Sequence, residues 1–219
     1  MADRTNVLSQ RGRPNYHHGS LRSAMIEAAE AVIDECGLAG FSMREAARRA
    51  GVSPGAPTHH FKDARGLLTA VAAAAFRRFG AALEAEAHHP DLKDRLRAQA
   101  LAYLRFAVAE RNKFLLMWRV DLIDRGSPEY SDAIQRATGV LMSARRDQAP
   151  LVSDEDPFRD VNVRIARLND VALSPAVAVW TLVHGFSTLI INGVFGDAED
   201  NVVKSHEDRL LELLDQLAL

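Results

Sequence analysis

Basic and small residues between Phe41 and Lys62 have the spacing that a nucleic-acid contact surface requires. Arg44, Arg48 and Arg49 recur on the outer face of one expected helix, where guanidinium groups can bind phosphates or base edges. Small residues in the segment that follows let the backbone approach a duplex closely. We therefore predict DNA contacts from Arg11, Arg13, Ser42, Arg44, Ser53, Gly55, Ala56, Thr58, His59, His60 and Lys62.

Two short helices joined by a tight turn are expected to position these side chains. Ser42 is suited to cap the first helix, and Gly51, which adopts a positive φ without steric cost, ends it. Ser53 followed by Pro54 forms an N-cap and first-position pair that opens the second helix, which ends near Phe61. A pair of this kind places its second helix in the major groove of DNA.

Flanking helices are expected to complete this N-terminal unit. Ser20 caps an upstream helix that ends at Gly37, and Asp63 caps a long downstream helix. The upstream helix is predicted to bury a stripe made of Leu21, Met25, Ala28, Val32 and Cys36, and the downstream helix one made of Leu67, Leu68, Val71, Phe76, Phe79 and Leu83. We expect a flexible basic arm at residues 1–19, a three-helix DNA-binding domain at 20–66 and a C-terminal regulatory and dimerisation domain at 67–219.

Three consecutive motifs, YHHGSLR, AAEAVIDECGLAGFSMREAARRAGVSPGAP and HFKDARGLL, resemble those of the TetR/AcrR transcriptional regulators. The likeness covers residues 16–79, and the cluster of Trp180, His184 and Gly185 is similar to the C-terminal domain of the Trp-His-Gly branch of that family. The resemblance implies an all-α bacterial repressor: a homodimer that binds a palindromic operator and releases it when a small organic molecule enters the C-terminal domain.

Two positions depart from the family pattern. Thr58 stands where most members have a tyrosine that touches the DNA backbone, and Ala64 stands where most have a lysine that pairs with a phosphate. Loss of a phosphate contact weakens DNA binding and its salt dependence unless Lys62 or Arg65 replaces it. The alternative to a regulator is therefore a ligand-binding helical dimer with weakened or lost DNA binding.

Charge is distributed as a DNA-binding N-terminus requires, although the 219-residue chain carries a net charge of −2. Residues 1–65 hold nine cations against seven anions, +2, and the remainder holds 18 against 22, −4. The arm has no apolar signal core, and Arg11 and Arg13 are placed to enter the minor groove beside the second helix. The alternative for the arm is a solvated tail.

Other residue types argue against a redox, metal or catalytic site. The only cysteine, Cys36, excludes an internal disulfide and fits packing in a reducing cytoplasm. Histidines occur as adjacent pairs at 17–18, 59–60 and 88–89, and neighbouring helical side chains point about 100° apart, so the pairs do not chelate a metal. Neither a metal nor a cofactor is expected, and His184 alone does not make an enzyme active site.

From residue 90 onward the pattern predicts a helical bundle. Asp91 after Pro90 opens one helix, residues 114–122 form another, and Ser127-Pro128 opens a third. Residues 149–156 are expected to form a loop and 157–168 a short helix. A small-molecule cavity, or else ordinary core, is predicted among Tyr103, Phe106, Phe114, Met117, Trp118, Trp180 and His184.

Residues 176–195 contain no charged side chain and are long enough to cross a bilayer. Polar residues within the segment and the lack of flanking basic clusters favour a buried helix over a membrane span. A helix that is apolar on most of its circumference must be covered on two sides. One stripe, Val177, Trp180, His184, Thr188 and Ile191, is expected to face the cavity. With the terminal helix at 202–217, the dimer contacts are predicted to be Phe186, Ile190, Leu210 and Leu214.

Overall fold

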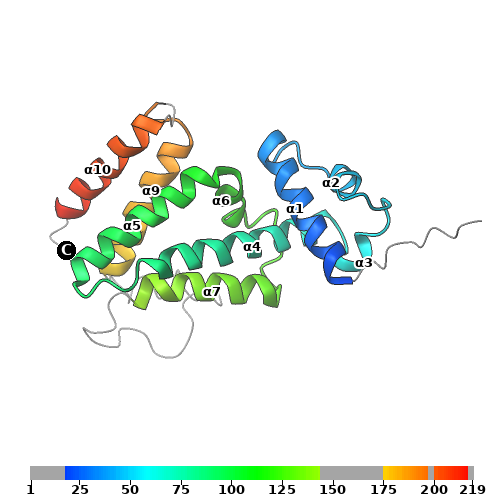
Figure 1. Cartoon of the computed structure of the whole chain (residues 1–219), viewed down its shortest axis with the longest axis horizontal. Coiled ribbons are helices and arrows are strands. Elements are labelled where there is room, and N and C mark those ends of the chain that lie inside the picture. Colours follow the sequence, from blue (N-terminus) through cyan, green and yellow to red (C-terminus); the bar gives the residue numbers. More distant parts are fainter. Residues whose placement is uncertain (1–17, 144–174, 197–199, 217–219) are drawn as a thin grey trace, which may run out of the picture.

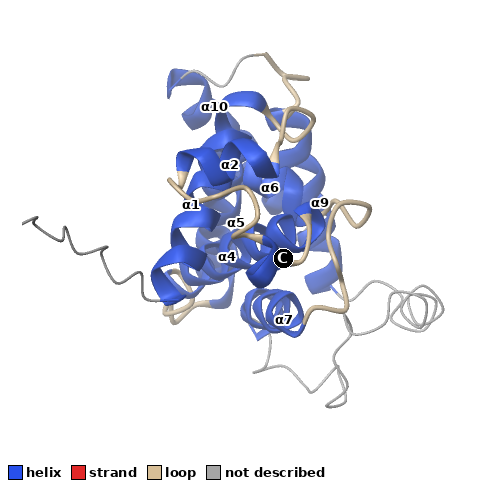
Figure 2. Cartoon of the chain, turned by 90° about the vertical axis from the view of Figure 1, so that its right-hand side faces the viewer, coloured by secondary structure: helices blue, strands red, loops and turns tan. Residues whose placement is uncertain are grey.

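The computed structural model describes residues 18–143, 175–196 and 200–216, and these residues form helices and no strand (Figure 2). This confirms the predicted all-α class. Arg11 and Arg13, the rest of the arm, the predicted loop at 149–156 and the predicted helix at 157–168 lie outside the described residues. The helices are α1 (His18–Cys36), α2 (Met43–Arg49), α3 (Thr58–Phe61), α4 (Ala64–Ala85), α5 (Leu92–Ala109), α6 (Arg111–Met117), α7 (Pro128–Ser143), α9 (Pro175–Ile191) and α10 (Asp200–Gln216).

Helices α1, α2 and α3 form a compact unit at one end of the molecule, here called the head (Figure 1). The Ser42 side chain accepts a hydrogen bond from the Glu45 amide at 3.4 Å, and Gly51 has a φ of 69°, so both predicted ends of α2 are confirmed. Asp63 caps α4 by accepting from the Gly66 amide at 2.9 Å. A Cβ at Gly66 would lie 1.8 Å from the Phe61 carbonyl oxygen, so only glycine lets α4 start so close to α3.

The predicted start of α1 is wrong, and the predicted buried stripe is confirmed only at Met25 and Val32. The helix begins at His18, two residues before Ser20, and its buried stripe is Met25, Ile26, Ala29, Val32 and Ile33. Cys36 is exposed, because it is the last helical residue and the chain turns away at Gly37, where φ is 68°. Leu21 and Ala28 are only partly buried. The face of α1 that packs is therefore rotated towards Ala29 and Ile33.

Helix α4 runs from the head into the C-terminal bundle, and α7 packs along its length (Figure 1). A Cβ at Gly80 would lie 3.2 Å from Cα of Ala137, so the glycine permits this close approach. All six residues predicted for the packing face of α4 are buried. Among the described residues α4 is also long and apolar enough to cross a bilayer, but 67% of that apolar window is buried inside the protein, as in a core helix.

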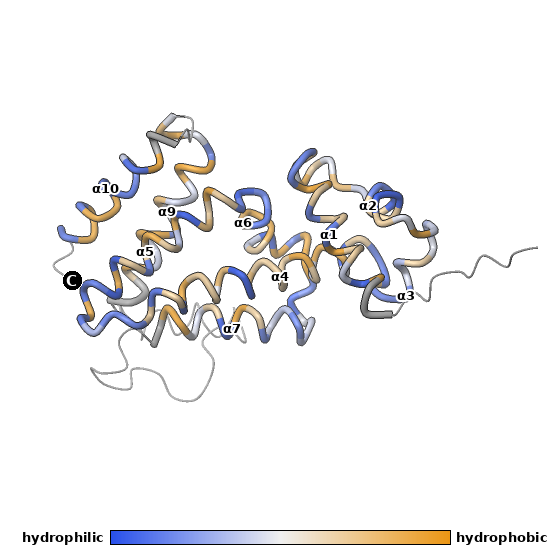
Figure 3. The backbone as a smooth tube through the Cα atoms, in the orientation of Figure 1, coloured by the Kyte–Doolittle hydropathy of each residue, from blue (hydrophilic) through white to orange (hydrophobic). Residues whose placement is uncertain are grey.

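The remaining helices surround this core. Asp91 caps α5, and Pro128 is the first residue of α7, as predicted. Helix α6 ends at Met117 and does not extend to residue 122. Helix α9 ends at Ile191, short of residue 195, and forms a largely apolar segment packed on α5 (Figure 3). Helix α10 contacts both α5 and α9, so the C-terminal helices close one side of the bundle.

Candidate DNA-binding surface and ligand site

The segment from α2 to α3 presents most of its predicted DNA-contacting residues to solvent. Those that are exposed are Ser42, Arg44, Ser53, Gly55, Thr58, His59 and Lys62, whereas Ala56 and His60 are half-buried. Beneath this surface Ala46, Ala47 and Phe61 are buried and pack against α1 and α4. Arg22 of α1 lies over the Phe61 ring, 5.6 Å from its centroid. The core thus fixes α3 while its outer surface stays free.

The second helix begins later than predicted. Residues 54–57 form turns, in which the Ala56 amide donates to the Ser53 carbonyl at 3.0 Å, and α3 starts only at Thr58. A helix opened by Ser53 and Pro54 would need the amide of residue 57 to donate to the Ser53 carbonyl. Residue 57 is a proline and has no amide hydrogen, so that first helical bond cannot form. The Thr58 hydroxyl instead donates to the Gly55 carbonyl within the turn.

Ion pairs distinguish the three outer arginines of α2. Arg48 donates to both carboxylate oxygens of Glu45 at 2.8 and 2.7 Å, and Arg49 bridges Glu45 and Glu35. Hydrogen bonds from Arg48 and then Arg49 lower the pKa of Glu45 to about 2. Arg44 is exposed and forms no such pair with a described residue. Of these three arginines, Arg44 has the guanidinium available for DNA.

The link between α3 and α4 holds a second available cation. Lys62 has a φ of 68° and a ψ of −57°, and the Asp63 amide donates to the Phe61 carbonyl at 2.7 Å. This is a γ-turn with a positive φ at its centre, a rare and strained conformation of a kind that concentrates at functional sites. Arg65 is occupied differently, because it donates to the Ile123 carbonyl at 2.6 Å. Lys62, rather than Arg65, is thus available to replace the cation missing at Ala64.

An aromatic cluster lies inside the bundle. The ring of His184 on α9 is 4.9 Å from that of Trp118, 5.7 Å from those of Phe114 and Trp180, and 6.2 Å from that of Tyr103, between centroids. Five of the seven predicted cavity residues therefore come together: Tyr103 from α5, Phe114 and Trp118 from α6 and its C-terminal end, and Trp180 and His184 from α9. We call them the aromatic cluster.

His184, the histidine of the aromatic cluster, is neutral because it is largely buried. The Tyr103 hydroxyl lies 2.8 Å from Nδ1 of His184, within hydrogen-bond distance, and burial lowers the pKa of His184, which favours the neutral ring. Burial also raises the pKa of Tyr103 well above its ordinary value, so the phenol keeps its proton. The other two predicted residues lie outside the cluster: Phe106 packs on Phe79, and the Met117 carbonyl accepts from Tyr130.

Comparison with known proteins identifies the family. A model of the "Tetracyclin repressor-like, C-terminal domain" matches residues 96–214, more than half of the chain, and a model of "Bacterial regulatory proteins, tetR family" matches residues 25–71. The chain belongs to the TetR family. It is thus a transcriptional regulator with a helix-turn-helix domain and not an enzyme, as the sequence predicted.

Individual relatives share part of the sequence or the fold with this chain. The HTH-type transcriptional regulator BetI of Yersinia pestis (strain Pestoides F) is 37% identical over 82 residues, a match that spans 37% of this chain and 41% of that relative. A solved protein of unknown function from Rhodococcus sp. RHA1 is 29% identical, with a TM-score of 0.62, and the match covers 91% of this chain and 98% of the other. A TetR variant from Acinetobacter baumannii AYE in complex with minocycline shares the fold at 18% identity and a TM-score of 0.56, over 90% of this chain and 95% of its own.

A residue that the sequence reading missed, Gln99, lies beside the aromatic cluster of this TetR-family chain. Its side chain is 2% exposed, its amide donates to the Leu83 carbonyl at 3.4 Å, and its Oε1 has no hydrogen-bond partner within the described part of the chain. It lines a cavity of about 30 Å³ with Tyr103, Trp180 and five aliphatic side chains. The sequence does mark this residue, because Gln99 is a polar side chain that interrupts the apolar stripe of α5 between Leu96 and Tyr103.

The predicted dimer contacts are mostly covered within a single chain, and of the four only Phe186 also lines the surface groove described below. Phe186, Ile190, Leu210 and Leu214 are 7%, 1%, 0% and 5% exposed within a single chain, because they pack α9 and α10 onto their own bundle. The face of α9 that carries Val179, Val183, Phe186 and Ile190 therefore packs inward. The outer surface of α9 and α10 is a groove, here called the outer groove, lined by Thr181, Leu182, Gly185, Phe186, Leu189, Phe195, Arg209, Glu212, Leu213 and Gln216.

Proposed function

We propose that this TetR-family chain is a ligand-responsive repressor that binds a palindromic operator as a homodimer and releases it when a small organic molecule occupies the aromatic cluster. The observation that carries the proposal is the exposed α2–α3 surface, on which Arg44 and Lys62 are available, fixed by buried Phe61. One short recognition helix reads few base pairs. Two heads on half-sites about 34–36 Å apart supply the missing specificity.

The outer groove is our proposed dimer interface. Leu189 on α9 is 42% exposed and Phe195 is 41% exposed, an unusual degree of exposure for large apolar side chains. Arg209 and Glu212 on α10 flank them and offer charges of opposite sign to a symmetry-related copy. Two copies of α9 and α10 would then form a four-helix interface, in which the apolar side chains are covered.

The proposed effector is uncharged. None of the residues that line the cavity beside Gln99 is charged, and the buried Oε1 of Gln99 lacks a hydrogen-bond donor within the described part of the chain. A molecule that donates a hydrogen bond to Gln99 would satisfy this group. The cavity now holds about one water molecule in volume, so such a ligand must displace the surrounding side chains and helices.

The separate positions of the DNA-binding surface and the ligand site imply limits for the two domains. We propose a DNA-binding domain at residues 20–66, preceded by a basic arm at 1–19, and a regulatory domain at 67–219. The boundary falls in the first turn of α4, so the same rigid helix belongs to both parts. We place the C-terminal domain in the Trp-His-Gly branch on Trp180, His184 and Gly185, and we place the protein in the cytoplasm, where its operator is.

A second function, a ligand-binding dimer that has lost DNA binding, is favoured by one observation. Arg48, Arg49 and Arg65 are all bonded within the protein, and Ala64 offers no charge. Gel shift with DNA from upstream of the gene, against random duplex at the same salt, decides between the two. The repressor predicts a shift of the upstream DNA alone at low protein concentration. The second function predicts no shift of either duplex, and equal shifts of both would show DNA binding without sequence preference, which contradicts both functions.

A further inference from the structure

The centre of the α2–α3 surface is small and uncharged. Residues 53–60, which lie between Arg44 and Lys62 in the sequence, contain no Lys, Arg, Asp or Glu. A Cβ added to Gly55 would meet nothing beyond its chain neighbours within 4 Å, so the described part of the protein leaves this surface open. Hydroxyl, imidazole and methyl groups are therefore what this segment can offer to DNA. Its exposed residues are Ser53, Pro54, Gly55, Thr58 and His59.

The hydroxyl group of Thr58 is already engaged within the protein. Thr58 is exposed, and its hydroxyl donates to the Gly55 carbonyl in the turn before α3. A hydroxyl has one proton to donate, and phosphate oxygens accept hydrogen bonds from donors. Thr58 therefore cannot donate to a phosphate while it keeps this bond. It does not replace the backbone contact of the tyrosine that most members of the family have at this position.

The γ-methyl group is the part of the Thr58 side chain that remains for DNA. Threonine branches at Cβ into a hydroxyl and a methyl group, which point in different directions. In Thr58 the hydroxyl branch faces the backbone of Gly55, so the methyl branch is what this exposed side chain offers to a duplex. In the major groove, the apolar group on a base edge is the C5-methyl of thymine, and a threonine methyl is among the groups that contact it.

Packing of α3 fixes the position of Thr58. Pro57 and Phe61, which precede and follow it on the inner side of the segment, are buried. The Lys62 amide donates to the Thr58 carbonyl at 3.0 Å, which closes the single turn of α3. The backbone that carries the methyl group is thus held from both directions along the chain.

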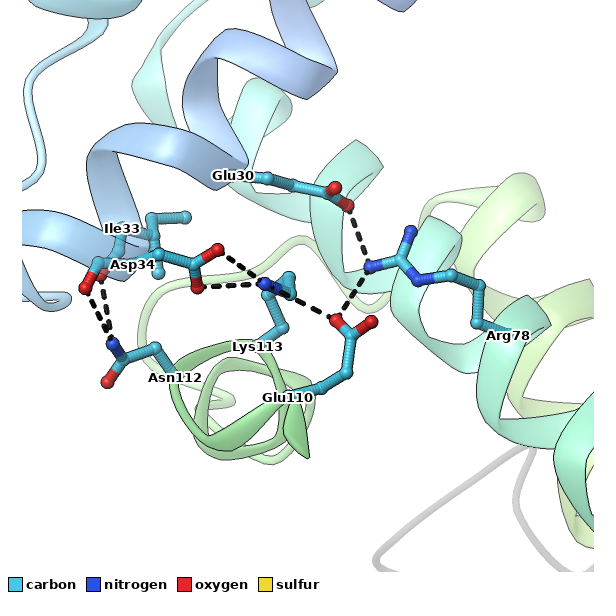
Figure 4. A network of polar contacts seen from close by, with 7 residues as sticks. All are labelled: Glu30, Ile33, Asp34, Arg78, Glu110, Asn112 and Lys113. Carbon is cyan, nitrogen blue, oxygen red and sulfur yellow. Dashed lines mark hydrogen bonds and ion pairs between the residues drawn. The ribbon is translucent and has the colours of Figure 1, made fainter. Parts of the chain in front are cut away.

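The head itself is tied to the bundle through ion pairs on α1 (Figure 4). Lys113 of α6 donates to both carboxylate oxygens of Asp34 at 2.8 and 2.7 Å. Arg78 of α4 donates to Glu30 of α1 at 2.9 Å and to Glu110 at 3.1 Å. A gap of about 0.5–1 Å already forfeits a quarter to a half of a van der Waals contact, so a methyl group discriminates between bases only from a rigid support of this kind.

We propose that Thr58 reads a base: its γ-methyl group contacts the C5-methyl of one thymine in each half-site of the operator. The inference rests on the proposed function, because it names a base that the α2–α3 surface recognises. Threonine in place of tyrosine thus exchanges a contact common to all DNA sequences for one that depends on a single base pair.

Uracil, which is thymine without the C5-methyl group, isolates this contact. A duplex that the wild-type protein selects from a random library is resynthesised with symmetric pairs of thymines changed to uracil, one pair at a time. At one of these pairs, the wild type should bind the uracil duplex about fourfold more weakly per half-site, or about 15-fold for the dimer, as expected for one buried methyl group.

Two substitutions of Thr58 separate the methyl group from the hydroxyl. Thr58→Ser keeps the bond to Gly55 and removes the methyl, so the ratio of affinities for the thymine and uracil duplexes should fall to about one. Thr58→Val keeps a methyl and removes the hydroxyl, so the ratio should persist; any effect of the lost hydrogen bond is common to both duplexes and cancels. Thr138→Ser on α7 is the matched control, because the Thr138 hydroxyl also donates to a backbone carbonyl, that of Ile134 at 2.7 Å.

Two results would overturn the inference while the selected duplex is still bound tightly. One is that no thymine pair can be found whose replacement weakens wild-type binding, and the other is a ratio that is the same in Thr58→Ser as in the wild type. A ratio kept in Thr58→Ser but lost in Thr58→Val would assign the contact to the hydroxyl and also overturn it. If the selection enriches no sequence, the proposed function itself fails, and the inference fails with it.

Discussion

Arg44→Ala is expected to weaken operator binding without changing the stability of the protein. Arg44 is exposed and forms no ion pair with a described residue, so its removal should change the free energy of unfolding by less than about 0.5 kcal/mol. A bidentate contact to a base edge contributes about 1–3 kcal/mol. A dimer carries the contact twice, so the loss is about 2–6 kcal/mol, or about 30-fold to 10⁴-fold in affinity.

Arg48→Ala is the matched control, one helical turn further along α2. Its guanidinium is held by Glu45 through two hydrogen bonds, so we expect its loss to affect operator binding much less. Fluorescence anisotropy with operator and random duplexes measures both variants. Equal weakening on the two duplexes by Arg44→Ala, with a smaller salt slope, would show a phosphate contact only. No weakening at all would refute the assignment of Arg44 to the interface.

Three further changes follow from the structure. Ala64→Lys should strengthen binding to operator and random DNA alike and steepen the salt slope by about 0.9 per subunit; an unchanged slope would place residue 64 away from the phosphates. Leu189→Asp should give monomers in analytical ultracentrifugation, because it puts a carboxylate in the outer groove; a persistent dimer would place the interface elsewhere. Burial lowers the pKa of His184 and His206 below 6.5, so the unfolded chain binds more protons than the folded one at acidic pH. The free energy of unfolding should therefore fall as the pH drops below 6.5, and urea titrations should show a shallower fall for His184→Gln than for the wild type. An equal dependence of the free energy of unfolding on pH in the two proteins would contradict this.

Signals that act locally in the sequence could be predicted reliably. Ser42, Asp63 and Asp91 cap their helices as expected, because an N-cap depends only on the next three residues. Gly51 ends α2 for the same local reason. The late start of α3 is also encoded locally, since Pro57 lacks the amide that the first helical bond after Ser53 needs.

Orientation within the bundle could not be predicted from α9 alone. Its sequence is apolar on most of the helix circumference, and only the packed structure shows that Phe186 and Ile190 are buried within the same chain, where α9 contacts α5, α7 and α10. Thr181 and Gly185 lie on the outer surface of α9 beside Leu189, so this surface has no continuous apolar pattern from which an interface could be predicted. The grouping of Trp118 and Trp180 around His184 is predictable from residue type. The ion pair between Lys113 and Asp34 is not, because it joins residues 79 positions apart in the sequence.

Titration of a fluorescent duplex from upstream of the gene, at near-physiological salt, tests the central claim most directly. The account predicts two protomers per duplex and binding at least about 10³-fold tighter than to random DNA of the same length. It also predicts that Arg44→Ala lowers this ratio. Equal affinity for the two duplexes, or one protomer bound per duplex, would contradict a dimeric operator-binding regulator.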